Sequence, residues 1–79
     1  MRPEFQVRVE CYAGYKADEK PLRFHMRGRC YQVEEVLDQW YGVEDTWFSV
    51  RAADGNLYVL RHRVTAQLDS WTLESYRRG

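Results

Sequence analysis

Apolar and polar residues alternate along most of this chain, and this two-residue period constrains the fold more than any other feature. In the segment 5–12, every second residue is apolar: Phe5, Val7, Val9 and Cys11. The pattern is typical of a β-strand with one buried face. It recurs in four further segments: 22–27, 47–53, 57–64 and 71–76. The sequence therefore predicts an all-β protein.

Size and composition narrow the class of protein further. The 79 residues suffice for one small domain, 1–79, and 44% apolar residues are too many for a disordered chain. Twelve Lys and Arg balance twelve Asp and Glu, which excludes a strongly basic nucleic-acid clamp. No apolar run is long enough to span a membrane, and the first residues do not read as a signal peptide. We therefore expect a cytoplasmic protein without membrane contact.

Two short turns predict two hairpins. Gly28-Arg29 suits a two-residue type II′ turn, and its register places Phe24 opposite Val33 and Arg23 opposite Glu34. The apolar side chains of this hairpin would then share one face of the sheet.

The second hairpin is centred on Asp54-Gly55. A three-residue loop pairs Phe48 with Leu60 and Val50 with Tyr58. A two-residue loop sets Phe48 against Arg61 instead. We expect the three-residue loop, since both of its pairs are apolar.

The segment 33–41 has two interpretations. Val33, Val36, Leu37 and Trp40 have helical spacing, and Gly42 would end a short helix. A strand through the same segment needs a bulge near Glu34-Glu35 to keep its apolar residues inward. We favour a long, bent strand because predicted strands flank the segment closely on both sides.

Five or six antiparallel strands joined by short turns must curl to cover a single core. The expected fold is a curved sheet or small barrel about the size of an SH3 domain. The residues expected to be largely buried are Val7, Val9, Phe24, Met26, Tyr31, Val33, Leu37, Phe48, Val50, Leu60 and Leu73.

The chemistry-bearing residues do not form a recognisable catalytic, cofactor or metal motif. Cys11, Cys30, His25 and His62 lack the short pairs of a structural zinc site, and we expect both cysteines to be thiols. His25 and Cys30 lie near one hairpin end but do not face each other in the predicted register. We therefore expect a protein that is not an enzyme and has no cofactor or metal.

Arginine is the most suggestive residue type, because its planar guanidinium binds phosphates, carboxylates and aromatic rings. The candidate macromolecule-binding residues are Arg23, Arg27, Arg29, Trp47, Arg51 and Arg61. In the expected register, the last three share one sheet face. Three interpretations stay open: ion pairs within the sheet, a protein interface, or stacking and steering of single-stranded nucleic acid.

An acidic stretch forms the second charged feature. It contains Glu34, Glu35, Asp38, Glu44 and Asp45, with no basic residue among them. Its two interpretations are a solvated face and a docking surface for a basic partner.

Four segments resemble a known family: VECYAGYKADEKPLRF, YQVEEVLDQWYG, FSVRAADGNLYVLRH and WTLESY. They are similar to a family of small, uncharacterised bacterial all-β domains. These occur as short proteins and at the C-terminus of inactive relatives of Y-family DNA polymerases, in the damage-induced mutagenesis cassette. The resemblance implies a cytoplasmic, non-catalytic accessory domain associated with DNA repair, and it supplies no site residues. The chain departs from the family over 63–70, where a shorter acidic turn is expected.

Two functions are consistent with these observations. The first is a binding module that contacts a macromolecule, either a protein or single-stranded nucleic acid, through the Arg and aromatic residues of one sheet face. The alternative is a self-associating or protein-docking domain that uses an exposed sheet edge.

Overall fold

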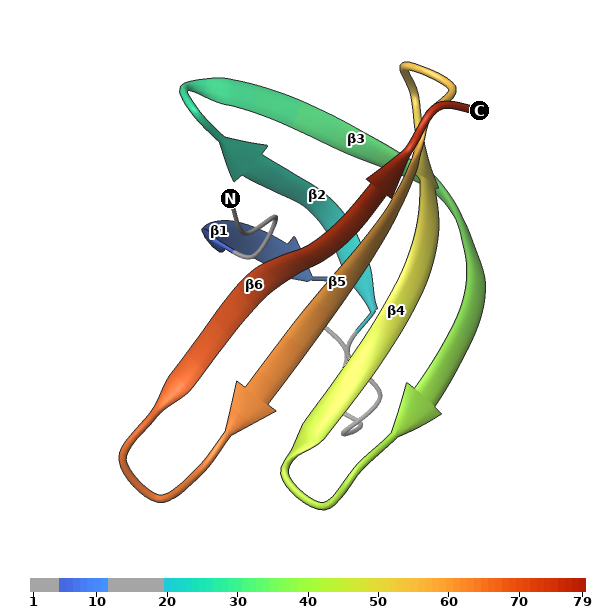
Figure 1. Cartoon of the computed structure of the whole chain (residues 1–79). Helices are drawn as coiled ribbons and strands as arrows, with labels where there is room; N and C mark the ends of the chain where they lie inside the picture. Colours follow the sequence, from blue (N-terminus) through green and yellow to red (C-terminus); the bar gives the residue numbers. More distant parts are fainter. Residues whose placement is uncertain (1–4, 12–19) are drawn as a thin grey trace.

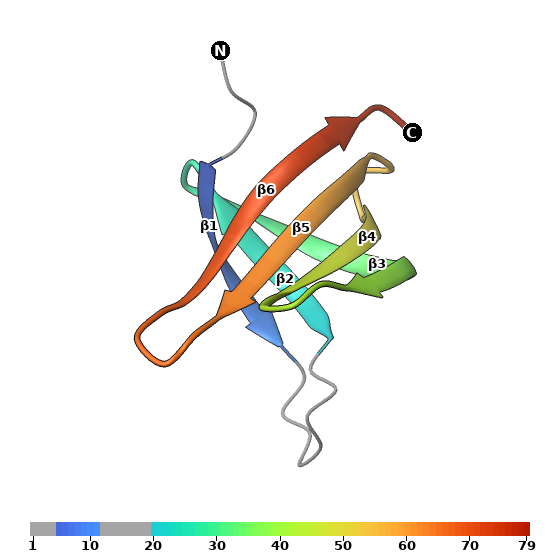
Figure 2. The same ribbon diagram turned by 60° about the horizontal axis from the view of Figure 1, so that its bottom comes forward.

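The computed structural model describes residues 5–11 and 20–79, which form a closed barrel of six antiparallel strands (Figure 1). The strands are β1 (Phe5–Cys11), β2 (Pro21–Met26), β3 (Arg29–Tyr41), β4 (Asp45–Ala52), β5 (Leu57–Val64) and β6 (Asp69–Arg77). Each strand pairs with the next, and β6 lies between β5 and β1, which closes the ring (Figure 2). The predicted all-β fold is confirmed.

The longest strand, β3, belongs to two parts of the barrel (Figure 1). Residues 29–32 pair with β2, and residues 33–41 pair with β4. The register with β4 shifts between Val33 and Glu35 and again between Val36 and Asp38. Bulges bend a strand, so the two shifts let one strand pass from β2 to β4. The bent strand and its first bulge were predicted, the second bulge was not, and the alternative of a helix over 33–41 is wrong.

The first hairpin turns one residue earlier than predicted. Its turn is Arg27-Gly28, with φ angles of 53° and 78°, as a type I′ turn requires. Phe24 therefore lies opposite Tyr31 instead of Val33. The Phe24 and Tyr31 rings stack with centroids 5.1 Å apart. This contact offsets the cost of a left-handed conformation at an arginine.

The second hairpin has the predicted register. Phe48 pairs with Leu60 and Val50 pairs with Tyr58. Gly55 has a φ of 87°, a left-handed conformation that glycine adopts without steric cost in a three-residue hairpin loop. The apolar pairs and the turn residue agree, which is why the sequence predicts this hairpin correctly.

The core lies inside the barrel, between β2 and the strands β4, β5 and β6. Its buried residues are Phe24, Phe48, Val50, Ala52, Tyr58, Leu60, Trp71 and Leu73. Of the predicted core, Val7, Val9, Met26, Tyr31 and Val33 are half-buried and pack against this cluster.

Leu37 contradicts the core prediction, because 43% of it is exposed. Val36 faces Val50 and Asp38 faces Ser49, so Leu37 is the extra residue of the second bulge. An unpaired bulge residue has no partner on the neighbouring strand, and the sequence period does not reveal it.

A pair of leucine truncations tests this placement of the core. Leu60→Ala should lower the free energy of unfolding by about 2–5 kcal/mol, because Leu60 is fully buried. Leu37→Ala should lower it by less than about 1 kcal/mol. Urea unfolding followed by tryptophan fluorescence measures both, and equal losses would contradict the structure.

Candidate functional site

The outer face of β4 and β5 carries the predicted row of arginine and aromatic residues. Trp47 lies opposite Arg61, and Arg51 lies opposite Leu57. Trp47, Arg51 and Arg61 therefore share one face, as the expected register requires. All three side chains are partly buried.

Carboxylates of neighbouring strands match the arginines of this face. Arg63 donates two hydrogen bonds to Asp45, at 2.8 and 3.0 Å. The Arg61 Nε lies 3.6 Å from Glu74 and 4.0 Å from Asp45. The hydrogen bond from Arg63 lowers the pKa of Asp45 despite partial desolvation. A phosphate would have to displace these carboxylates, so the face is poorly suited to anion binding.

Arg51 is also paired with carboxylates, which belong to β3. Its Nη2 donates to Glu35 Oε1 at 2.6 Å, and its Nε lies 3.9 Å from Glu34. Of the three interpretations, ion pairing within the sheet is therefore the one that the geometry favours for this row.

Arg23 was predicted to face Glu34, and this prediction is wrong. Arg23 instead forms an ion pair with Glu10 of β1. Glu10 also lies 2.7 Å from the Nε2 of His25. The hydrogen bond from His25, followed by that from Arg23, lowers the pKa of Glu10. The earlier turn also makes His25 and Cys30 cross-strand partners, contrary to the predicted register. The Nε2 of His25 is nevertheless bonded to Glu10 and not to Cys30.

Arg27 and Arg29 lie elsewhere, in and beside the β2–β3 turn, where both are exposed. The six candidate residues therefore divide into three places. Trp47, Arg51 and Arg61 lie on the β4–β5 face, Arg23 lies beside β1, and Arg27 and Arg29 lie at one end of the barrel.

Trp40 is an exposed aromatic residue that was not among the predicted binding residues. It lies opposite Trp47, and the two indole rings stack with centroids 6.2 Å apart and an interplanar angle of 7°. Gly42 lets the chain turn closely over this pair, since a Cβ there would lie 3.0 Å from the Trp47 ring. The signal in the sequence was the Trp40-Tyr41 pair at the end of the acidic stretch.

The second half of β3 has one paired and one open edge. Residues 33–41 pair with β4, and no strand of the described chain pairs with their other side (Figure 1). From Asp38 to Tyr41 the pairing with β4 is regular. An open strand edge presents backbone donors and acceptors to which an added strand can bind.

Aromatic and acidic side chains gather along this edge, which we call the β3 edge and define as residues 34–44. The exposed fractions are 43% for Leu37, 41% for Trp40 and 67% for Tyr41. The edge also carries Glu34, Glu35, Asp38 and Glu44, all of them exposed. The surface thus combines unpaired backbone, aromatic rings and negative charge.

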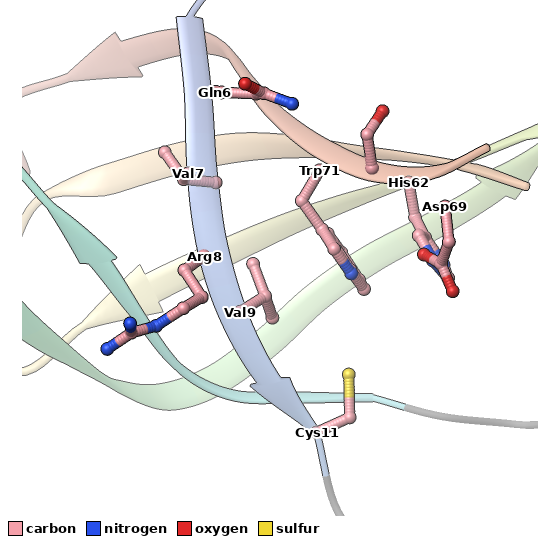
Figure 3. A pocket seen from close by; sticks show the side chains of 9 residues that line it. Gln6, Val7, Arg8, Val9, Cys11, His62, Asp69 and Trp71 are labelled. Carbon is pink, nitrogen blue, oxygen red and sulfur yellow. The ribbon is translucent and has the colours of Figure 1, made fainter.

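A hollow opens where β1 and β6 separate (Figure 3). On its β6 side, the His62 ring stacks on Trp71 at 4.1 Å, and its Nε2 lies 2.7 Å from Asp69. The thiol of Cys11 lies on the β1 side (Figure 3). One face of the His62 ring and its Nε2 are therefore both engaged by neighbouring side chains.

Within residues 5–11 and 20–79, no three His, Cys, Asp or Glu side chains are grouped to hold a metal ion. The same residues include no helix that could cross a membrane. Compared with protein-family models, curated proteins and solved structures, the chain matches none of them. The suggested family therefore stays a prediction.

The Asp45–Arg63 pair predicts a pH dependence of stability. The pKa of Asp45 is lower in the fold than its ordinary 3.8, so its contribution is present above pH 3.8 and is lost as the pH falls through the folded value. Asp45→Asn should destabilise the protein at pH 7, and the difference from wild type should shrink on acidification. Urea unfolding at several pH values measures this.

The matched control for this series is Asp38→Asn, because Asp38 is exposed and its only bond among the described residues is to the backbone of Gln39. It should leave the stability at pH 7 nearly unchanged. A difference between Asp45→Asn and wild type that does not vary with pH would contradict the ion-pair account.

Proposed function

We propose that the protein is a binding module that takes up an extended, basic segment of a partner protein along the β3 edge. The observation that carries this proposal is the open side of β3 beside the regular stretch Asp38–Tyr41. An extended segment can add to such an edge through main-chain hydrogen bonds, while its side chains give specificity.

Charge supports a basic partner. Between Gln32 and Asp45 the chain has no Lys, Arg or His, and only Arg51 comes from β4 to match Glu35 and Glu34. Asp38 and Glu44 add further negative charge. Lys or Arg side chains on an incoming strand would complement this edge and steer its approach.

The exposed rings supply the anchors. Tyr and Trp dominate the binding energy of protein interfaces, because they bury a large area at low entropic cost. Trp40 is held in place by stacking on Trp47, so little ordering is needed when a partner covers it. Tyr41 is exposed on the opposite face of the strand from Trp40, and Leu37 is exposed at the second bulge.

Two rival functions receive less support. Self-pairing of β3 edges centred near Val36 would set Asp38 against Glu34 or Glu35 of the second copy, and like charges directly opposite destabilise a sheet. Single-stranded nucleic acid on the Trp47 face would have to compete with the carboxylates that neutralise Arg51 and Arg61. The suggested resemblance supports placing this module in the bacterial cytoplasm, in association with DNA-repair proteins.

A peptide-display selection tests the proposal. A random peptide library is selected on the immobilised wild-type protein and depleted on Trp40→Ser. We expect peptides with a net positive charge and few prolines. A selected peptide, titrated into labelled protein, should shift the backbone amides of Asp38–Tyr41 in NMR spectra. Trp40→Ser should weaken its binding by about tenfold or more, the loss typical of an interface hot spot.

The matched control is Tyr76→Ala, which removes an exposed ring of β6, separated from β3 by β4 and β5, and should bind the peptide as wild type does. Light scattering should show a monomer from micromolar to millimolar concentration. The proposal fails if no peptide is enriched, if the shifts lie outside the edge, or if a dimer forms that Trp40→Ser disrupts.

A further inference from the structure

A second hollow lies at the end of the barrel that is opposite to the β3–β4 turn. It is formed by the β2–β3 turn, the β4–β5 turn and the end of β6, and its aromatic lining consists of Tyr31, Tyr58 and Tyr76. Met26 and Leu73 add apolar lining, and Arg27 and Arg29 line the hollow in and beside the β2–β3 turn.

The three tyrosines form a continuous aromatic wall. The Tyr58 ring contacts Tyr31 with centroids 5.6 Å apart and Tyr76 with centroids 5.3 Å apart. Tyr58 is buried, whereas Tyr31 is half-buried and Tyr76 is 50% exposed. The outer two rings are therefore accessible, and the middle ring fixes their positions.

Among the described residues that line this hollow, the only carboxylate is Asp54, and neighbouring side chains already bond to it. Asp54 accepts a hydrogen bond from the Tyr58 hydroxyl at 2.7 Å and two from Asn56, at 2.9 and 3.2 Å. Burial and the bond to Asp54 raise the pKa of Tyr58, which keeps the hydroxyl protonated as a donor. Asp54 thus stabilises the turn and the tyrosine.

Arg29 supplies positive charge to the hollow. In the observed register it pairs with Met26 and stands two residues before Tyr31, so it shares their face of the sheet. No carboxylate of the described residues pairs with it. A cationic ligand is disfavoured at these rings because Arg29 and Arg27 line the same hollow.

We propose that this end of the barrel binds a nucleobase that carries a phosphate, with the base against Tyr76 and Tyr31 and the phosphate on Arg29. Aromatic faces stack bases of any identity, and a guanidinium binds phosphate through paired donors. The source is either a free nucleotide or the end of a single strand. The site is separate from the β3 edge, so each proposal can fail without the other.

NMR titrations at low salt test this proposal with four probes: adenosine 5′-monophosphate, adenosine, inorganic phosphate and an eight-residue oligothymidylate. We expect the nucleotide and the oligonucleotide to shift the amides of Arg29, Tyr31 and Tyr76. Adenosine alone and phosphate alone should each bind at least about tenfold more weakly than the nucleotide, because each makes only part of the contacts. Equal affinity for the mononucleotide and the oligonucleotide identifies a free nucleotide as the source, whereas tighter, more salt-sensitive oligonucleotide binding identifies a strand.

Variants assign the binding to the named residues. Arg29→Glu should abolish the shifts, while Lys20→Glu, the same charge change immediately before the start of β2, should preserve them. Tyr76→Ala should weaken binding by about fivefold or more, and Tyr76→Phe should retain it because the ring remains. Unfolding midpoints close to wild type verify that each variant folds. The proposal is overturned if neither nucleotide probe shifts these amides, if phosphate alone binds as tightly, or if Arg29→Glu behaves as Lys20→Glu does.

Discussion

The barrel depends on the division of one strand between two neighbours. β3 pairs with β2 over residues 29–32 and with β4 over residues 33–41, and two bulges accommodate the change of direction. Without this bend, β2 could not reach β1 while β4 and β5 cover the same core. The bend also leaves one edge of β3 open, because residues 33–41 pair with β4 but no longer with β2.

Charge is arranged to suit this architecture. On the faces of the sheet, arginines and carboxylates pair across strands, as in Arg63 with Asp45 and Arg51 with Glu35. At one end of β3, Arg29 lies beside the tyrosines and has no matching carboxylate among the residues that the structure describes. Negative charge stands with Trp40 and Tyr41 toward the other end. Although the net charge of the chain is zero, the two ends of β3 therefore carry opposite charge.

The fold was largely predictable because its determinants are local. Alternation defines the strands, and the Asp54-Gly55 turn with two apolar pairs fixes the second hairpin. The errors arose where tertiary contacts decide. Arg27 adopts a left-handed conformation because Phe24 and Tyr31 stack, and Leu37 is exposed because of a bulge. The ion pairs of Arg23 and Arg61 were not predicted, because their partners Glu10 and Glu74 come from strands that no local pattern connects to them.

Amide hydrogen exchange along β3 tests the open edge most directly. In β5, which is paired on both sides, we expect slow exchange at successive amides. Between Asp38 and Tyr41 we expect alternation instead, with slow exchange at amides that face β4 and fast exchange at those that face the open side. Uniformly slow exchange in this stretch of the monomer would show that the edge is covered, and would contradict the account.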